Sequence, residues 1–262
     1  MFFDIKNHLL FDTEPLSRCA MDLQMAVGMA YNGYQQGCRS VMATPPDDAF
    51  LKELSNPDAT GLPERIRSKM NLLRCTLRGL LPRMQLFLGC ELICTPENID
   101  RLIFHLNRGH LPTLNGTGYV LVSFRDDIPL SDIWLCFDKL KDAGYDPILS
   151  HAESLQALKW NLHEIRALKG DGPRDNDRHK FRCKIQVDTT SFHHSIHNQA
   201  WARELIRSGV VDLLASDARN TSSHPVHIRE EVASITPLCT PDYLDAITFR
   251  NAQNLFGAPQ EV

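Results

Sequence analysis

Four short stretches of the sequence each place a potential metal ligand directly after a run of residues typical of a β-strand. They contain His8, Glu91, His151 and Asp217, in that order. Imidazole and carboxylate groups are ligands that manganese, iron and zinc accept in proteins. Divalent ions held in this way polarise a phosphoryl oxygen and activate water. The stretches therefore predict the remains of one polynuclear metal site with the chemistry of a metallohydrolase.

Two basic residues stand beside these candidate ligands. Lys6 comes two residues before His8, and Arg219 comes two residues after Asp217. Since an ionised carboxylate buried without a partner is costly, we hypothesise that Lys6 and Arg219 replace metal ions by pairing with Glu91 and Asp217. The two cations are also suited to bind an anion such as phosphate. In the alternative, both side chains point into solvent and the site is only eroded.

The elements that must position these residues alternate along the chain. Buried strands are predicted wherever a short run rich in Val, Ile, Leu or Phe is bounded by polar residues, Gly or Pro. These runs are residues 2–5, 40–43, 85–89, 119–123, 147–150, 184–187 and 212–215. Apolar residues at helical spacing predict helices between them. The helical segments are residues 16–34, 63–80, 131–143, 155–169 and 198–208.

Strands that alternate with helices indicate right-handed crossovers and a parallel sheet. Candidate ligands at several strand ends favour a closed barrel, because barrel sites are built at the carboxyl ends of the strands. An open, doubly wound sheet is the alternative. We therefore predict an α/β fold with a single domain over residues 1–262 and a polar loop inserted at about residues 170–182.

The composition argues against several classes of protein. A net charge of −4 and an isoelectric point near 6.2 give no general attraction to nucleic acid or anionic lipid. The N-terminus has no secretory leader, and no apolar stretch is long enough to insert into a membrane, so we expect a cytoplasmic protein. The 8 cysteines include no Cys-x-x-Cys pair, and we interpret them as free thiols.

Taken together, the motifs resemble the polymerase-and-histidinol-phosphatase (PHP) superfamily, and most closely its CpsB/CapC branch of manganese-dependent tyrosine phosphatases of capsule biosynthesis. The family's opening Asp-Ile-His-Cys-His-Ile-Leu resembles residues 4–10, its Gly-x-Glu resembles residues 89–91, and its Leu-Asn-Gly-Thr-x-Tyr resembles residues 114–119. Its Pro-Ile-(Ile/Leu)-Ala-His-Pro-Glu-Arg is similar to residues 147–154, and its Ala-Ser-Asp-Ala-His-Asn to residues 215–220. The resemblance covers nearly the whole chain.

The chain departs from the family pattern at several ligand positions. Where the family has a histidine or a bridging glutamate, this sequence has residues that cannot ligate in the same way: Lys6, Pro46, Ser123 and Arg219. Two arginines expected for phosphate recognition are matched by Ser154 and His224. Asp12 or Glu14 could supply a further acidic ligand. The resemblance thus implies His8, Glu91, His151 and Asp217 as the residual ligands.

The resemblance also implies a fold and a pathway. We expect a distorted (β/α)7 barrel of PHP type that binds no metal or a single divalent ion, Mn, Fe or Zn. The chain would be a degenerate tyrosine-phosphatase-like protein of exopolysaccharide or capsule biosynthesis, catalytically impaired, that acts as a partner of a bacterial tyrosine kinase or of the polysaccharide export apparatus. The alternative is a metal-dependent phosphotyrosine phosphatase with a reduced site. A homo-oligomer is compatible with either.

Two further interpretations rest on residues outside these motifs. A relocated metal site could form from histidines at helical spacing, because such spacing brings two imidazoles to one face; these are His193, His194, His197, His224 and His227. A scaffold that binds a saccharide could use the aromatic residues Phe11, Phe192 and Trp201. The sequence contains no Gly-x-Ser-x-Gly or Cys-x5-Arg motif that would supply a nucleophile instead.

Overall fold

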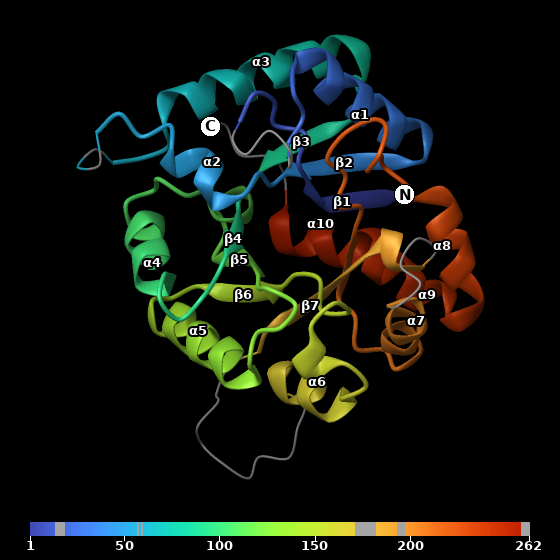
Figure 1. Cartoon of the computed structure of the whole chain (residues 1–262). Coiled ribbons are helices and arrows are strands. Elements are labelled where there is room, and N and C mark those ends of the chain that lie inside the picture. The colour runs from blue at the N-terminus through green and yellow to red at the C-terminus, as the bar shows by residue number, and fades with distance from the viewer. Residues whose placement is uncertain (14–18, 57, 59, 171–181, 193–197, 258–262) are drawn as a thin grey trace.

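The strands of the protein are parallel and lie at its centre (Figure 1). The computed structural model describes residues 1–13, 19–56, 58, 60–170, 182–192 and 198–257. Within them, one sheet has the order β1-β2-β3 and a second has the order β4-β5-β6-β7-β8. The strands are β1 Phe2–Asn7, β2 Cys38–Ala43, β3 Gln85–Leu88, β4 Glu91–Ile93, β5 Tyr119–Ser123, β6 Asp146–Leu149, β7 Lys184–Asp188 and β8 Leu213–Ala215.

The two sheets approach each other at both edges. Backbone bridges join Asn7 to Ala218 on one side and Pro46 to Glu91 on the other. The predicted α/β class with parallel sheets is therefore confirmed. The edges meet through single bridges in the described residues rather than through continuous ladders, so complete closure into a seven-unit barrel stays a prediction.

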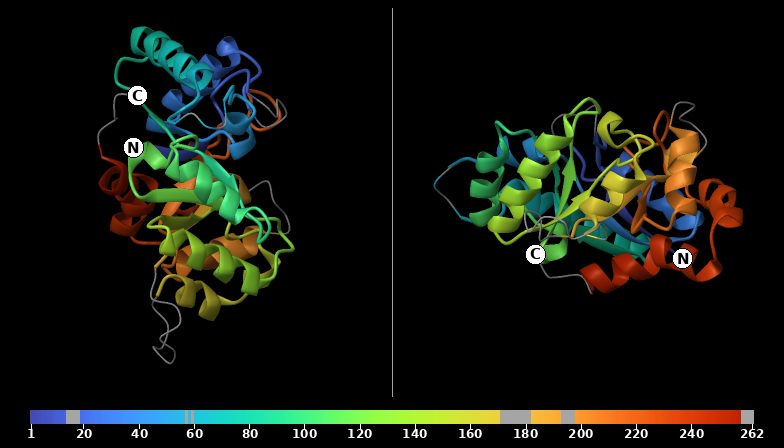
Figure 2. Two further views of the ribbon diagram at one scale, coloured as in Figure 1. Left: turned by 90° about the vertical axis from the view of Figure 1, so that its left-hand side faces the viewer. Right: turned by 90° about the horizontal axis from the view of Figure 1, so that it is seen from below.

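Helices cover the outside of the strands, as the views in Figures 1 and 2 agree. Helices α1 and α3 contact each other beside the three-stranded sheet, and α4 and α5 contact each other beside the five-stranded sheet. The helices are α1 Leu23–Gln35, α2 Asp47–Leu51, α3 Glu64–Leu80, α4 Ile99–Asn107, α5 Leu130–Asp142, α6 Leu162–Leu168, α7 Gln199–Arg207, α8 Arg229–Ile235, α9 Pro241–Asp245 and α10 Asn251–Phe256.

The buried apolar residues form two clusters. The smaller cluster joins Phe3 and Ile5 of β1 to residues from other strands, and Phe256 of α10 packs against Phe3 with 5.9 Å between the ring centroids. Side chains alternate in direction along a strand, so after Phe3 and Ile5 the next inward side chain of β1 would be that of residue 7. The pairing of β1 with β2 is irregular between Asp4 and Asn7, and this irregularity accompanies the inward direction of the Lys6 side chain.

Some predicted element boundaries were wrong. The helix predicted over residues 16–34 begins at Leu23, because the Asp22 side chain accepts a hydrogen bond from the Met25 N–H and caps the helix there. The segment predicted as one helix over 155–169 is a 3₁₀ turn followed by α6. Strand β4 was not predicted as a separate strand. The predicted polar loop lies mostly outside the described residues, which resume at Arg182.

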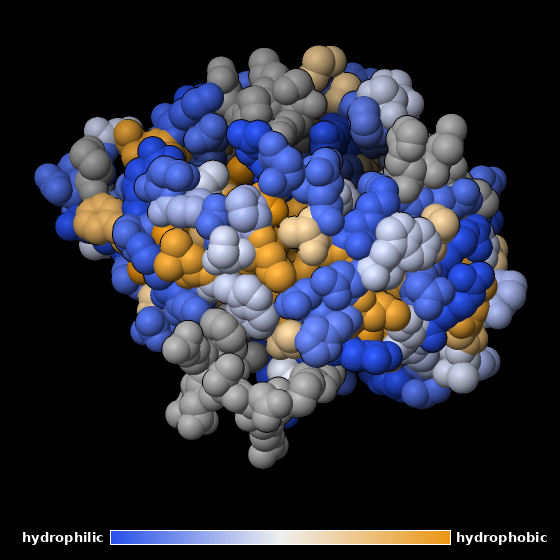
Figure 3. All heavy atoms as spheres, turned by 60° about the horizontal axis from the view of Figure 1, so that its bottom comes forward, coloured by the Kyte–Doolittle hydropathy of each residue, from blue (hydrophilic) through white to orange (hydrophobic). Residues whose placement is uncertain are grey.

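On the face shown in Figure 3, apolar side chains form a band between hydrophilic regions. Exposed apolar side chains are common on folded proteins and identify no function by themselves. Among the described residues, no helix combines the length and hydropathy needed to cross a bilayer. All 8 cysteines are free, as predicted, and most of them are buried.

Candidate active site

The four predicted ligands come together at the carboxyl ends of the strands. His8 follows β1, Glu91 comes three residues after the end of β3 and begins the short strand β4, His151 follows β6 and Asp217 follows β8. These segments are far apart in sequence, but the parallel pairing brings their ends to one side of the sheets. Every residue named above is buried except His151, whose side chain is 22% exposed. The histidine therefore lies nearest to solvent.

Lys6 lies between the two acidic members of this group. Its Nζ is 2.9 Å from Glu91 Oε1 and 3.0 Å from Asp217 Oδ1, and it also makes a hydrogen bond to His151 Nε2. The lysine side chain is completely buried. Burial alone would lower the pKa of Lys6, but the attraction of Asp217 and Glu91 outweighs burial and raises the pKa above its ordinary value. The group is therefore a fixed internal ammonium ion.

His8 adds a second source of positive charge. Its Nε2 lies 3.2 Å from Asp217 Oδ1 and 3.6 Å from Glu91 Oε2. Burial opposes the charged imidazolium, but the hydrogen bond to Asp217 and the charge of Glu91 raise the pKa of His8 to about 9. At neutral pH the ring is thus protonated and donates to the carboxylate.

Glu91 is held as a carboxylate by its neighbours. Burial would raise the pKa of Glu91, yet Lys6 and His8 lower it below the usual value. Ser123 Oγ donates a hydrogen bond of 2.5 Å to Oε1 of the same carboxylate. In the family that the sequence resembles, a bridging glutamate stands at the position of this serine. Here the serine donates a hydrogen bond to the glutamate that remains, Glu91.

Arg219 points to Asp217 and away from bulk solvent. Its Nη2 lies 2.6 Å from Asp217 Oδ2, and its side chain is 28% exposed. Burial raises the pKa of Asp217, but Lys6, His8 and Arg219 together hold it well below its usual range. The hypothesis that Lys6 and Arg219 swing into solvent is inconsistent with these contacts.

Asp4 supports the segment that carries Asp217. The Ser216 backbone N–H donates to Asp4 Oδ1 at 2.8 Å, and Ser216 Oγ donates to Oδ2 at 2.6 Å. Asn7 Nδ2 donates to the same Oδ2 at 2.9 Å. Burial raises the pKa of Asp4 to about 6, while these hydrogen bonds oppose the shift. The first and last strands are therefore tied together directly below the site.

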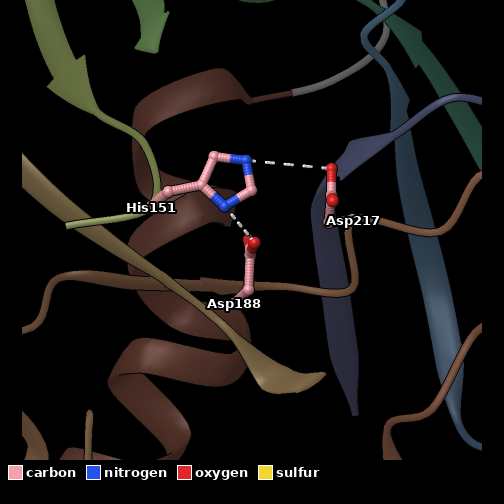
Figure 4. A group of neighbouring side chains, drawn as sticks. All are labelled: His151, Asp188 and Asp217. Atoms are coloured by element: carbon pink, nitrogen blue, oxygen red, sulfur yellow. Dashed lines mark ion pairs between the residues drawn. The ribbon is translucent and has the colours of Figure 1, made fainter. Parts of the chain in front are cut away.

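Asp188 is a site residue that sequence reasoning missed. As the last residue of β7, its Oδ2 pairs with His151 Nδ1, and Gln186 Nε2 donates to its Oδ1 at 2.8 Å. Figure 4 shows the imidazole of His151 between Asp188 and Asp217. An acidic residue at a strand end was the available signal. His151 itself has a φ of +52°, and Asp217 a φ of +51°, both in the left-handed region that residues other than glycine adopt uncommonly.

A second buried carboxylate lies behind Asp188. Glu153 Oε1 accepts hydrogen bonds from the Asp188 N–H at 3.1 Å and from Ser191 Oγ at 2.8 Å. Burial and the nearby charge of Asp188 raise the pKa of Glu153 to about 8. Burial likewise raises the pKa of Asp188 to about 7, against the attraction of Lys6. One of these two groups therefore carries a proton near neutral pH.

A cavity of about 440 Å³ opens beside Asp217. It is lined by hydroxyl and imidazole groups of the segment after β7 and of the loop after β8, together with one proline: Thr190, Ser222, Ser223, His224, Pro225 and His227. Asn220 shapes this loop, because its Oδ1 accepts hydrogen bonds from the backbone N–H groups of residues 222, 223 and 224.

The remaining predicted positions have other surroundings. Pro46 precedes α2 and forms the backbone bridge to Glu91. Ser154 donates to Asp126 at 2.9 Å. Asp12 Oδ2 lies 3.5 Å from Lys69 Nζ, and Glu14 lies outside the described residues.

The saccharide-binding scaffold and the relocated histidine metal site were the two alternatives that rested on residues outside the motifs. Phe11, Phe192 and Trp201 are buried in the core, so they lend no support to the alternative of a saccharide-binding scaffold. In the proposed relocated metal site, residues 193–197 lie outside the described residues. His224 and His227 line the cavity beside Asp217.

Part of this group could hold a metal ion. In the described residues, His151, Asp188 and Asp217 offer ligand atoms that all lie within 4.8 Å of one another. A polynuclear cluster does not fit, because the Lys6 ammonium occupies the space between Glu91 and Asp217. A unit charge and a divalent ion about 4 Å apart repel each other by roughly 8 kcal/mol at an effective dielectric constant of about 20.

Comparisons with known proteins place the chain in context. A family model described as capsular polysaccharide synthesis, CpsB/CapC, matches residues 2–257. The tyrosine-protein phosphatase CpsB of Streptococcus agalactiae serotype V is 22% identical over 263 residues, which cover 96% of this chain and 97% of that protein. The tyrosine-protein phosphatase CpsB of Streptococcus pneumoniae is 23% identical over 231 residues, covering 87% of this chain and 86% of that protein.

A solved structure has the same fold. It comes from a study of YwqE from Bacillus subtilis and CpsB from Streptococcus pneumoniae, which are described as unique metal-dependent tyrosine phosphatases. The two structures agree with a TM-score of 0.76 at 21% sequence identity, over 99% of this chain and 96% of the other.

Proposed function

Because the chain belongs to the CpsB/CapC family of capsular polysaccharide synthesis, we propose that it recognises phosphotyrosine in capsule or exopolysaccharide biosynthesis, with side-chain cations in place of a metal cluster. The single observation that carries this proposal is the position of Lys6. Its completely buried ammonium lies about as close to Glu91 and Asp217 as a hydrogen-bonded ion pair allows. His8 and Arg219 complete the compensation of both carboxylates.

The charge balance explains why such a site would be stable without metal. Removing one partner from a buried ion pair leaves an uncompensated charge and costs about 3–5 kcal/mol. Lys6 avoids this cost for Glu91 and Asp217 together, since its Nζ touches both. The proposed consequence is a protein impaired in the metal chemistry that the relatives' names imply.

The cavity beside Asp217 supports phosphotyrosine as the ligand class. Hydroxyl and imidazole groups donate hydrogen bonds to phosphoryl oxygens, and this cavity presents both kinds of group around Pro225. Arg219 pairs with Asp217, which lines this cavity, and supplies a guanidinium, whose geometry suits phosphate. A tyrosine-phosphorylated segment of a bacterial tyrosine kinase, or of the export apparatus, on the cytoplasmic side is the proposed partner.

A metal-dependent phosphotyrosine phosphatase with a reduced site is the second candidate. The names of the relatives favour it, and His151, Asp188 and Asp217 could hold one divalent ion. When bound, such an ion would polarise a phosphoryl oxygen and lower the pKa of water. Lys6 opposes it, because its ammonium contacts both His151 Nε2 and Asp217.

The two candidates are distinguished by binding and turnover on one protein preparation. Calorimetry with a phosphotyrosyl peptide and its unphosphorylated form measures recognition, and hydrolysis of the same peptide is followed with Mn²⁺ or with EDTA. The first candidate predicts binding selective for the phosphorylated peptide and hydrolysis that Mn²⁺ does not increase. Manganese-dependent turnover that is lost in Asp217→Ala and retained in the control Asp127→Ala, an exposed carboxylate, would establish the second candidate.

A further inference from the structure

We propose that His151 is a nucleophile that accepts a phosphoryl group on Nε2, with Asp188 as its positioning residue and no requirement for metal. The inference rests on the proposed function for its physiological donor, a phosphotyrosine. The pairing of His151 with Asp188 is not explained by the replacement of metal charge by Lys6. The proposal assigns a chemical activity to these two groups.

The tautomer of His151 is set by its two neighbours. Asp188 accepts the hydrogen bond from Nδ1–H, which leaves the lone pair of Nε2 facing the Lys6 ammonium. An acidic residue on one ring nitrogen fixes both the orientation and the protonation of the imidazole, and it stabilises the positive charge that the ring gains on reaction. Figure 4 shows this order of groups, with Asp188 on one side of the ring and Asp217 beyond the other.

Gln186 holds both members of the pair in place. Its Oε1 accepts the His151 backbone N–H at 3.2 Å, and its Nε2 donates to Asp188 Oδ1 at 2.8 Å. The left-handed backbone of His151 is unfavourable for a residue with a Cβ, and such strain is concentrated at functional sites. His151 is also the most exposed of the four predicted ligands, with 22% of its side chain open to solvent.

The proposed transfer balances in two steps. The Nε2 lone pair attacks phosphorus, the bond from phosphorus to the tyrosyl oxygen breaks, and that oxygen leaves with the electron pair. Water then attacks phosphorus, the phosphorus–nitrogen bond breaks, and the electron pair returns to Nε2. One water proton is transferred to the tyrosyl oxygen, and the remaining hydroxyl stays on phosphate.

Lys6 has a defined part in this reaction. Its ammonium, held between Glu91 and Asp217, already contacts Nε2, so it would donate a hydrogen bond to the phosphoryl oxygens at the point of attack. Positive charge aimed at the developing negative charge lowers the barrier of phosphoryl transfer. The lysine would thus supply part of the electrostatic stabilisation that a metal ion supplies elsewhere.

Labelling the full-length protein with ³²P-phosphoramidate in EDTA tests the proposal. This small donor requires no recognition of phosphotyrosine, so failure of the proposed function and failure of this inference remain distinguishable. A phosphohistidine is labile in acid and stable in alkali, and tandem mass spectrometry of the wild-type protein locates it. We expect one phosphoryl group on His151, no label in His151→Gln, and labelling slowed by about 10²-fold or more in Asp188→Asn.

The outcomes separate cleanly because the modification is mapped in wild-type protein. Asp127→Asn, which changes an exposed carboxylate, should label like wild type. Thermal unfolding of each variant shows whether a loss of label is caused by a loss of fold. If a variant is unfolded, the proposal is judged by the position of the phosphoryl group in the wild-type protein. Absence of an acid-labile label in wild-type protein, or its location on His8 or His224, would overturn the assignment.

Discussion

Lys6 and Asp217 are joined twice, once through their side chains and once through their backbones. Lys6 Nζ lies 3.0 Å from Asp217 Oδ1, and the Asp217 N–H donates to the Lys6 carbonyl oxygen at 3.0 Å. The backbone contact fixes the segment after β8 against β1. The two side chains of the ion pair therefore lose little further conformational freedom when they meet. The position of the ammonium is therefore set by the fold and not by a flexible surface contact.

Replacing Lys6 by methionine removes the charge and keeps most of the side-chain volume. Glu91 and Asp217 would then be buried without this partner, so we expect a loss of about 3–5 kcal/mol in the free energy of unfolding in urea. The control Lys139→Met breaks a pair with the exposed Asp100 and should cost less than about 1 kcal/mol. Equal effects of the two substitutions would mean that Lys6 does not compensate the carboxylates.

We expect the Lys6→Met variant also to gain affinity for Mn²⁺. Without the Lys6 ammonium, the vacated space between the carboxylates favours a divalent cation. Added Mn²⁺ should therefore raise the unfolding midpoint of Lys6→Met and leave that of the wild-type protein unchanged, as measured by differential scanning fluorimetry. A wild-type midpoint that rises with Mn²⁺ as much as the variant's would argue against displacement of metal by Lys6.

His8 makes stability depend on pH. Its pKa is raised from 6.5 to about 9 in the folded protein, so the folded state binds more protons than the unfolded state in this range. The stabilising contribution is fully present below about pH 6.5 and is lost as pH rises through about 9. Its size is up to about 3 kcal/mol. Subtracting the unfolding free energies of His8→Gln from those of wild type should give this curve, whereas a flat difference would show that His8 is not protonated.

The tight packing around Gly89 predicts a sharp contrast between two glycines. A Cβ added at Gly89, two residues before Glu91, would lie 2.6 Å from Leu114 Cδ2 and 3.2 Å from Thr44 Cγ2. We expect Gly89→Ala to lower the free energy of unfolding by about 1–3 kcal/mol. Gly79 in α3 has open space at the same position, so Gly79→Ala should stabilise by about 0.5–1 kcal/mol. Chemical denaturation of both variants checks the sign of each change.

Most of the fold could be predicted because short apolar runs and turn residues are local signals. The runs before His151 and Asp217 form strands, and the motifs named from sequence come together as expected. Strand β4 was missed because only Gly89 and Cys90 separate it from β3, and the predicted strand already ended at Gly89. The start of α1 was misplaced because the capping carboxylate of Asp22 lies inside an otherwise helical pattern.

The site was harder to predict than the fold because it depends on side-chain direction. Sequence placed Lys6 near the predicted ligands, but its inward direction accompanies an irregular pairing between β1 and β2 that sequence does not reveal. Asp188 was overlooked because the predicted strand ended one residue earlier, at Val187. The left-handed backbone of His151 has no signal in sequence, since Gly or Asn would be the expected residue there.

Restoring the ligands of the resembling family should restore metal binding. The substitutions Lys6→His, Pro46→His, Ser123→Glu and Arg219→His remove two cations and add imidazole and carboxylate donors. We expect the combined variant to retain Mn²⁺ through gel filtration and to gain manganese-dependent hydrolysis of a phosphotyrosyl peptide. A variant that folds like wild type but neither binds Mn²⁺ nor hydrolyses the peptide would show that more of the site has diverged than these four positions.

The most direct test of the central claim is anomalous diffraction at the manganese edge from crystals of the wild-type protein soaked in Mn²⁺. The charge-replacement account predicts no metal peak between Glu91 and Asp217, with the Lys6 ammonium in contact with both carboxylates. Two adjacent metal peaks at the strand ends, with Lys6 displaced, in protein that hydrolyses phosphotyrosine, would contradict it.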